Sequence, residues 1–415
     1  MLRYGLIGAG GVGQIHARWA ARHPNVEFCA IADPSAGTGL ALSAGAKHYA
    51  DYQKMLDQER LDAVSIAIPH HALAMVGANC LAAGCNILME KPLARHIAEA
   101  GKLLERASRS NLQVGVCYQY RNFASPRSIK QIIDSGQIGA VRHIVWTWQE
   151  LRPASYYTNT PWRGSWQGAG GGLLMNQLIH DLDLIRWFAG DVENVQASLL
   201  NQAHDTPMED ALSASIRFRN GALATISATL NQSRTHNYRA IMGTKGLIVL
   251  PDAKMMASDP NDTILIGTYD QGTDAAIASY ADDHQQSQIR WKTINSRPRS
   301  ARRFLPRWLT PRVRRIADII RPARHGWDHG NRPLNGHGKS VWDFLDAVIN
   351  GTCLPAGMSG ESAYRTLEIA NAMTLSGIEA QAVQFPLDPA RYSALFEKLV
   401  SGQISIGSQG NHAPA

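Results

Sequence analysis

A glycine-rich turn near the start of the chain constrains the fold most strongly. Arg3–Ile7 is apolar enough for a buried strand, Gln14–Arg22 has a helical pattern, and a Gly-x-Gly-x-x-Gly string joins them. The residues expected to form this turn are Gly8, Gly10, Gly11, Val12 and Gly13. In such a turn the first glycine permits the tight bend, the second leaves room for a pyrophosphate, and the third lets helix and strand pack closely. The string therefore predicts a dinucleotide-binding Rossmann domain.

Asp33 lies 20 residues beyond Gly13, at the end of the second expected strand. Its carboxylate would accept hydrogen bonds from the adenosine ribose hydroxyls, while the amides at the helix N-terminus would receive the phosphates. A 2′-phosphate would be repelled, because Pro34, Ser35 and Ala36 provide no basic side chain to offset the charge. The pattern favours NAD over NADP.

Apolar runs and helical patterns alternate through the first part of the chain, which predicts a parallel sheet covered on both faces. The expected strands are Arg3–Ile7, Glu27–Ala32, Ala63–Ile68, Asn86–Glu90 and Leu112–Cys117, and the expected helices are Gln14–Arg22, Ala72–Ala83 and Ile97–Ser108. From about Ala140 longer strand patterns predict a mostly antiparallel sheet. They are Val141–Gln149, Val195–Asn201, Ala211–Arg219 and Ala222–Gln232, with a turn at Asn220-Gly221 and helices at Leu173–Phe188, Lys339–Asn350 and Glu361–Ser376.

The expected fold class is therefore α/β, with a doubly wound Rossmann sheet followed by a second α/β domain. We assign residues 1–120 to the NAD-binding domain and residues 121–400 to a substrate-binding and oligomerisation domain, with residues 401–415 as a mobile tail. The five cysteines form no Cys-x-x-Cys pair, which indicates a reducing compartment. Because the chain runs directly into a strand, no signal peptide is expected and the cytoplasm is favoured.

The net charge of +7 comes from one segment, residues 290–325, which holds twelve basic residues and one acid. Within it, residues 298–324 interleave arginine with large apolar side chains. We favour packing of this insertion against a neighbouring subunit, and the alternative is attachment to an anionic membrane surface or an acidic partner. Nucleic acid is not expected, because no nucleic-acid-binding fold accompanies the charge.

Two further motifs carry side chains suited to catalysis. Glu90-Lys91-Pro92 ends an expected Rossmann strand, where a lysine can hold a substrate hydroxyl, and the Lys–Pro bond is a place where a cis peptide costs little. On the helix after the glycine run 170–172, Asn176 and His180 would lie one turn apart, with Asp183 near enough to orient the imidazole. His325, Asp328, His329 and His337 match no zinc-binding spacing, so no metal is expected.

Together with the glycine turn, these motifs resemble the Gfo/Idh/MocA family, which includes glucose–fructose oxidoreductase and inositol dehydrogenase. The resemblance continues through Trp162-Arg163-Gly164-Ser165-Trp166 and into Trp342–Ala347. It implies an open, mostly antiparallel second sheet whose exposed face gives homo-dimers or homo-tetramers, and it places Lys91 and His180 on a substrate hydroxyl. Two departures are Asn176, where the family's dehydrogenases often carry aspartate, and Pro69-His70-His71, after which Leu73 replaces a frequent second histidine.

The resulting hypothesis is hydride transfer between NAD and a secondary alcohol of a sugar, cyclitol or sugar derivative. His180 would be the general base, and Lys91 and Asn176 would hold the substrate oxygen. Pro69, His70, Glu90 and Lys91 are expected beside the cofactor. The residues expected to contact substrate are Tyr118, Arg121, Tyr157, Trp162, Arg163 and Asn176.

Two other classes of function stay open at this point. A hydrolase or lyase of the same fold would use tightly held NAD transiently and show no net NADH. A non-catalytic NAD-binding protein tethered through its basic insertion would bind NADH and be indifferent to changes at His180.

Overall fold

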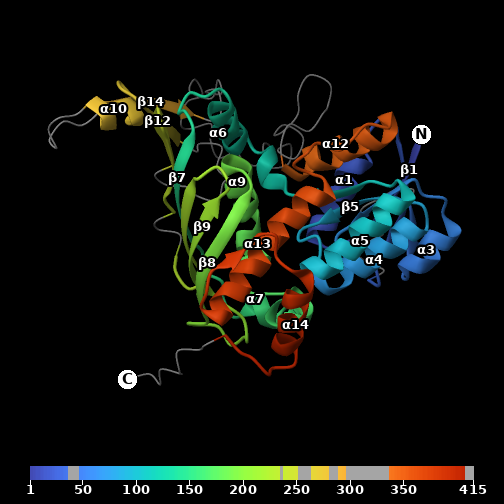
Figure 1. Cartoon of the computed structure of the whole chain (residues 1–415). Helices are drawn as coiled ribbons and strands as arrows, with labels where there is room; N and C mark the ends of the chain where they lie inside the picture. The colour runs from blue at the N-terminus through green and yellow to red at the C-terminus, as the bar shows by residue number, and fades with distance from the viewer. Residues whose placement is uncertain (36–45, 234–236, 251–262, 280–287, 296–335, 407–415) are drawn as a thin grey trace, which may run out of the picture.

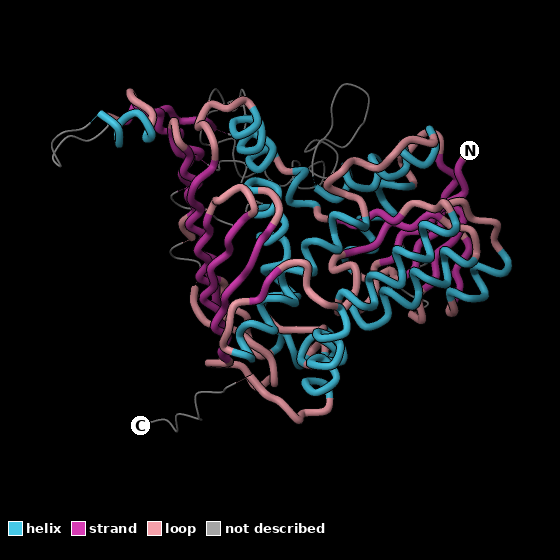
Figure 2. The backbone as a smooth tube through the Cα atoms, viewed as in Figure 1, coloured by secondary structure: helices cyan, strands magenta, loops and turns pink. Residues whose placement is uncertain are grey.

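The computed structural model describes residues 1–35, 46–233, 237–250, 263–279, 288–295 and 336–406. Two sheets form the framework, and Figure 1 shows them as two halves joined by the helices between them. The strands of both halves stand out in magenta in Figure 2. The expected α/β class, with a parallel sheet followed by a mostly antiparallel one, is confirmed.

The first sheet is parallel throughout, with the strand order β3-β2-β1-β4-β5-β6. Its strands are β1 (Leu2–Ile7), β2 (Val26–Ala32), β3 (Lys47–Tyr49), β4 (Ala63–Ile66), β5 (Asn86–Glu90) and β6 (Val114–Cys117). The connecting helices are α1 (Gly11–Ala20), α3 (Tyr52–Gln58), α4 (His70–Ala82) and α5 (Ile97–Ser110). The order reverses beside β1, where a doubly wound sheet binds its ligand.

Alternate residues of these strands enter different cores. Leu88 of β5 packs with Phe344 of α12 (Gly336–Asn350), whereas Ile87 and Met89 join the core on the other face, together with Leu103 of α5. Burial on both faces explains the uniformly apolar strands. Because α12 lies far along the chain, the C-terminal region returns to cover the first sheet (Figure 1).

The second sheet has the order β14-β13-β12-β11-β7-β10-β9-β8-β15, and all its neighbouring strands are antiparallel except the parallel pair β7 and β10. Its strands are β7 (Val141–Gln149), β8 (Val192–Leu200), β9 (Ala211–Phe218), β10 (Leu223–Thr229), β11 (Arg239–Gly243), β12 (Gly246–Leu250), β13 (Thr263–Tyr269), β14 (Ile289–Asn295) and β15 (Val383–Gln384). Buried and exposed residues alternate along β9, as in a sheet with one covered face.

Helices lie between this sheet and the first domain or at its ends. They are α6 (Ala124–Asp134), α7 (Ser155–Thr158), α8 (Trp166–Ala169), α9 (Ile179–Ala189), α10 (Thr273–Ser279), α13 (Gly360–Glu379) and α14 (Pro389–Val400), with short 3-10 turns η1 (Gln119–Asn122) and η2 (Pro161–Gly164). On α13, the hydroxyl oxygen of Ser376 accepts a hydrogen bond from the main-chain N–H of Ala197 at 3.0 Å, which connects the helix to β8.

Most expected elements are present with small shifts at their ends. The strands Asn86–Glu90 and Val141–Gln149 have the expected bounds, and Asn220-Gly221 joins β9 to β10 with Gly221 at φ +85°. The helix expected over Leu173–Phe188 is corrected: one turn of π-helix, η3 (Leu174–Leu178), precedes α9. β3 and α3 were not expected.

The basic insertion is described only where residues 290–295 form part of β14. Its segment 298–324, together with His325, Asp328 and His329, lies outside the described residues. At the C-terminus, Ile404 packs against the core and Ile406 is buried, so packing continues beyond Ser401. Within the described parts of the chain, no helix combines the length and apolar character needed to cross a membrane.

Candidate active site

The glycine turn has the shape that a bound dinucleotide requires. A Cβ on Gly8 (φ +90°) would meet the Ala67 carbonyl oxygen at 2.3 Å, and one on Gly13 would meet the Gly8 carbonyl oxygen at 1.9 Å. A Cβ on Gly10 or Gly11 would meet nothing within 4 Å. Thus two glycines are needed for packing, while two leave open space at the start of α1.

Asp33 lies directly beside this turn. Its carboxylate accepts the main-chain N–H of Ala9 at 2.7 Å and that of Ser35 at 2.8 Å. The acid at the end of β2 is therefore fixed next to the open side of Gly10, and Val12 at the start of α1 is partly exposed. Open glycines, a free helix N-terminus and an acid at the second strand fit the phosphates and ribose of NAD.

Lys91 follows β5, and its peptide bond to Pro92 is cis, as expected. The Lys91 ammonium donates a hydrogen bond to the main-chain oxygen of Asn176 at 2.9 Å, which joins the first domain to the segment that carries His180. Burial lowers the pKa of Lys91 to about 8, and the neighbouring Glu90 opposes that shift. This contact holds the Lys91 ammonium near enough to His180 for its charge to act on the imidazole.

His180 is buried in the first turn of α9. Its ring stacks on Tyr120, with centroids 4.3 Å apart, and meets Tyr118 edge-on at 6.1 Å. Burial, reinforced by the positive charge of Lys91, lowers its pKa well below the usual value, so the ring is neutral at pH 7. Nδ1 has no hydrogen-bond partner among the described residues. A neutral histidine with an unused ring nitrogen is equipped to exchange a proton.

Asn176 lies in η3 and is also buried. Its side-chain amide donates to the main-chain oxygens of Gly171 at 3.0 Å and Gly172 at 3.1 Å. The turn that holds Asn176 is π-helical, and His180 lies in α9, which begins after it, so the two residues do not share one continuous α-helix as expected. The side-chain amide hydrogens of Asn176 are bonded to the main chain of the glycine run, which leaves its side-chain oxygen for other contacts.

The expectation that Asp183 orients His180 is wrong. Arg121 donates to both oxygens of the Asp183 carboxylate at 2.6 Å, and the hydroxyl of Thr366 donates to one of them at 3.1 Å. Asp183 is fully buried on α9, which packs against η1 and α13. Arg121, expected to bind substrate, is committed to this ion pair.

Other expected site residues gather where the two domains meet. His70, which follows Pro69, donates a hydrogen bond from Nδ1 to the Ala169 carbonyl oxygen at 2.9 Å, and its ring centroid lies 4.7 Å from that of Trp162. The Arg163 guanidinium lies over Tyr156, 4.6 Å from the ring centroid. Tyr157 points elsewhere: it is buried, and its ring lies 5.2 Å from that of His204.

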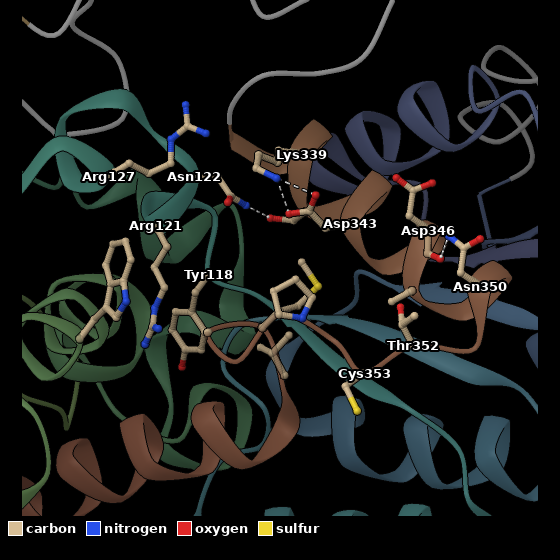
Figure 3. A pocket seen from close by; sticks show the side chains of 17 residues that line it. Tyr118, Arg121, Asn122, Arg127, Lys339, Asp343, Asp346, Asn350, Thr352 and Cys353 are labelled. Atoms are coloured by element: carbon tan, nitrogen blue, oxygen red, sulfur yellow. Dashed lines mark hydrogen bonds and ion pairs between the residues drawn. The ribbon is translucent and has the colours of Figure 1, made fainter. Parts of the chain in front are cut away.

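A cavity of about 450 Å³ lies on the α12 side of the junction, and Figure 3 shows Arg121 and Tyr118 at one end and Lys339 and Asp343 above it. Lys91 and His180 do not line it. Tyr118 therefore borders this cavity as well as the His180 ring, and Arg121 borders the cavity beside its ion pair with Asp183.

Glu209 is a residue of the site that no sequence pattern indicated. It is buried beneath η3 and binds the main chain of the glycine run. An acid just before a strand has no special spacing relative to His180, and only the tertiary fold brings the two segments together.

A dinucleotide turn, an acid beside it and a buried lysine and histidine at the domain junction define an NAD-binding oxidoreductase. Residues 2–118 match the description "Oxidoreductase family, NAD-binding Rossmann fold", and residues 127–249 match the GFO/IDH/MocA C-terminal domain. The chain belongs to the GFO/IDH/MocA family, as the sequence motifs indicated.

Individual relatives and solved structures match different shares of the chain. The rhizopine catabolism protein MocA of Rhizobium meliloti is 32% identical to this chain. The match covers 45% of this chain and 57% of that protein's length. Levoglucosan dehydrogenase of Pseudarthrobacter phenanthrenivorans is 28% identical over 60% of this chain and 73% of its own length. The structure of the WlbA dehydrogenase from Bordetella pertussis, in complex with NADH and UDP-GlcNAcA, has a TM-score of 0.69 at 21% identity over 93% of this chain and 99% of that chain. The similarity to the WlbA dehydrogenase structure supports the fold alone.

Proposed function

We propose that this oxidoreductase transfers hydride between NAD and a secondary alcohol of a sugar, cyclitol or sugar derivative. The observation that carries the proposal is the hydrogen bond from Lys91 to the main chain of Asn176, because it brings the end of a Rossmann strand against the segment that leads to His180. Relatives named levoglucosan dehydrogenase and inositol 2-dehydrogenase support the substrate class.

In this proposal His180 removes the hydroxyl proton. Burial keeps the ring neutral and able to accept that proton, and stacking on Tyr120 fixes its plane. Lys91 donates a hydrogen bond to the same oxygen and stabilises the negative charge that develops there. When bound, NAD supplies the hydride acceptor, and the same side chains return the proton in the reverse direction.

A panel of polyols and sugars with NAD tests this function. Full-length protein should form NADH with at least one of them, and His180→Ala and Lys91→Met should lower kcat by about 100-fold or more while NADH affinity is kept. His71→Gln is the matched control, because His71 is exposed on α4. Full turnover in either site variant would contradict the roles. Product formation without net NADH would instead support a hydrolase or lyase.

The assembly and surface expectations are separate proposals. We infer homo-dimers or homo-tetramers through the outward face of the second sheet, where β9 and β10 expose Ser213, Ser215, Thr225 and Ser227. Light scattering of the purified chain checks this. Attachment of residues 298–324 to an anionic surface is checked by vesicle co-sedimentation of the chain with and without that segment; an unchanged result would exclude it.

A further inference from the structure

Four side chains with metal-binding atoms converge behind the cofactor turn. The ligand atoms of His16, Glu90 and Cys117, all buried, lie within 4.8 Å of one another. His16 Nε2 is 3.1 Å from Glu90 Oε1, and His337 Nε2 is 3.6 Å from the same oxygen. The four residues come from α1, β5, β6 and α12, so no sequence spacing announces them.

We propose that His16, Glu90, Cys117 and His337 form a binding site for a divalent d¹⁰ metal ion such as Zn²⁺. Two imidazoles, a carboxylate and a thiolate are a donor set that tetrahedral zinc accepts. Zinc–ligand bonds are about 2.0 to 2.3 Å long, so binding requires these donor atoms to draw closer together.

The surroundings of His16 match those of a metal-bound histidine. Its second ring nitrogen, Nδ1, lies 2.9 Å from the hydroxyl oxygen of Ser65, which is itself hydrogen-bonded to the Tyr4 hydroxyl. In protein metal sites the ring nitrogen that does not bind the metal is normally hydrogen-bonded in this way, which fixes the tautomer and the ring plane. With Nδ1–H donating to Ser65, the Nε2 lone pair would face Glu90 and the metal.

The charges of such a site balance. Metal binding replaces the proton on the Cys117 sulfur, which leaves as a hydronium ion to solvent, and forms a metal–sulfur bond. The dication is then matched by one thiolate and the Glu90 carboxylate, while both imidazoles are neutral. A neutral complex is what a buried position can accommodate at low cost.

The cavity beside α12 lies next to this position. Cys117 is hydrogen-bonded to the side chain of Ser340, and Ser340 borders the cavity that Figure 3 shows, where it also accepts a hydrogen bond from Asn122 at 2.8 Å. Ser340 is therefore a neighbour shared by the cavity and the proposed site. A metal ion bound there would link α12 to the Rossmann sheet next to Lys91.

Titration of the full-length apoprotein with Co²⁺ tests the site directly, because thiolate-bound cobalt absorbs in a charge-transfer band and tetrahedral cobalt absorbs strongly in the visible range. We expect one Co²⁺ per chain, with both features, and displacement by Zn²⁺. Cys117→Ser should abolish the charge-transfer band, and His337→Asn should weaken Co²⁺ binding by at least about tenfold. Neither readout depends on the proposed hydride transfer.

Cys353→Ser is the matched control, since Cys353 is an exposed free thiol and the obvious place for adventitious binding. It should keep both the stoichiometry and the band. The proposal is overturned if the wild-type chain shows no band, if the band survives in Cys117→Ser, or if it disappears in Cys353→Ser. NADH titration confirms that each variant is folded; should Cys117→Ser fail that check, unweakened binding in His337→Asn overturns the proposal.

Discussion

The carboxylate of Glu209 accepts the main-chain N–H of Leu174 at 2.9 Å and, through its other oxygen, that of Gly172 at 3.0 Å. The main-chain oxygen of Glu209 accepts the intervening N–H of Leu173 at 3.0 Å. One residue thus satisfies three successive amides at the start of the segment that carries Asn176 and His180. Those amides would otherwise be unpaired inside the protein, where each unmet donor is costly.

Replacing Glu209 with Gln should therefore disturb the site through the main chain. An amide nitrogen in place of one carboxylate oxygen cannot accept a hydrogen bond, so one buried N–H loses its partner. We expect the free energy of unfolding to fall by about 1–3 kcal/mol and kcat to fall while NADH affinity is kept. Urea denaturation and NADH titration check this. Glu193→Gln, at a partly exposed position on β8, should change stability by less than about 0.5 kcal/mol; equal effects of the two variants would contradict the assignment.

Burial of His70 makes the folded state sensitive to acid. Burial, with the positive charge of Lys91 nearby, lowers the pKa of His70 to about 3, whereas the unfolded chain protonates near the usual value. Protons then bind the unfolded state preferentially, so stability is present above about pH 6.5 and is lost as the pH falls toward 3. From about pH 7 to pH 5 this residue alone should cost about 2 kcal/mol.

His70→Gln isolates that contribution, because glutamine retains a donor for the Ala169 carbonyl and does not titrate. Urea midpoints measured across this pH range should fall less steeply for the variant than for the wild-type protein. Parallel pH profiles for the two proteins would show that His70 is already solvated in the folded state.

The ion pair between Asp183 and Arg121 predicts a structural defect on mutation. Asp183→Asn leaves the largely buried Arg121 guanidinium without its counter-charge, which typically costs about 3–5 kcal/mol. Thr366→Val removes only the hydroxyl contact and should cost about 1 kcal/mol. Thermal or chemical unfolding measures both. If Asp183→Asn were as stable as the wild type yet inactive, a direct role in catalysis would replace the structural one.

Every described strand of the first sheet except β3 could be predicted, because buried parallel strands are uniformly apolar and the glycine turn marks where β1 meets α1. β3 is short and partly exposed, so it lacks that pattern. Gly8, Gly13 and Asp33 also lie where the local pattern placed them, since their geometry depends on neighbours in sequence. Asp183 could not be placed in this way. Spacing put it near His180, but its partners Arg121 and Thr366 come from distant segments, and the π-helical turn before α9 has no sequence pattern of its own.

Cofactor preference should depend on Asp33. Because its carboxylate accepts the N–H groups of Ala9 and Ser35, it is held in place beside the turn. Asp33→Ser removes the charge that would repel a 2′-phosphate, so the ratio of NADPH to NADH affinity should rise by about tenfold or more. Nicotinamide fluorescence titrations with both cofactors measure the ratio. An unchanged ratio would place the source of the preference elsewhere in the chain.

The glycines of the turn allow packing and cofactor binding to be separated. Gly13→Ala would place a Cβ 1.9 Å from the Gly8 carbonyl oxygen, so helix and strand must move apart, at a cost of about 1–3 kcal/mol. Gly10 has φ −63°, which alanine adopts freely, and its added Cβ would meet nothing within 4 Å. Gly10→Ala should therefore fold as well as the wild type.

Gly10→Ala should keep its stability but lose affinity for NADH. At Gly10 the methyl group would fill the space that the pyrophosphate needs, so we expect Gly10→Ala to weaken NADH binding by at least about tenfold while its unfolding free energy stays within about 0.5 kcal/mol of the wild type. A Gly10→Ala protein that binds NADH normally would mean that the phosphates do not pass this glycine. The assignment of a phosphate-binding site to residues 8–13 would then be wrong, because the open side of the turn is the feature that distinguishes a binding site from a tightly packed bend.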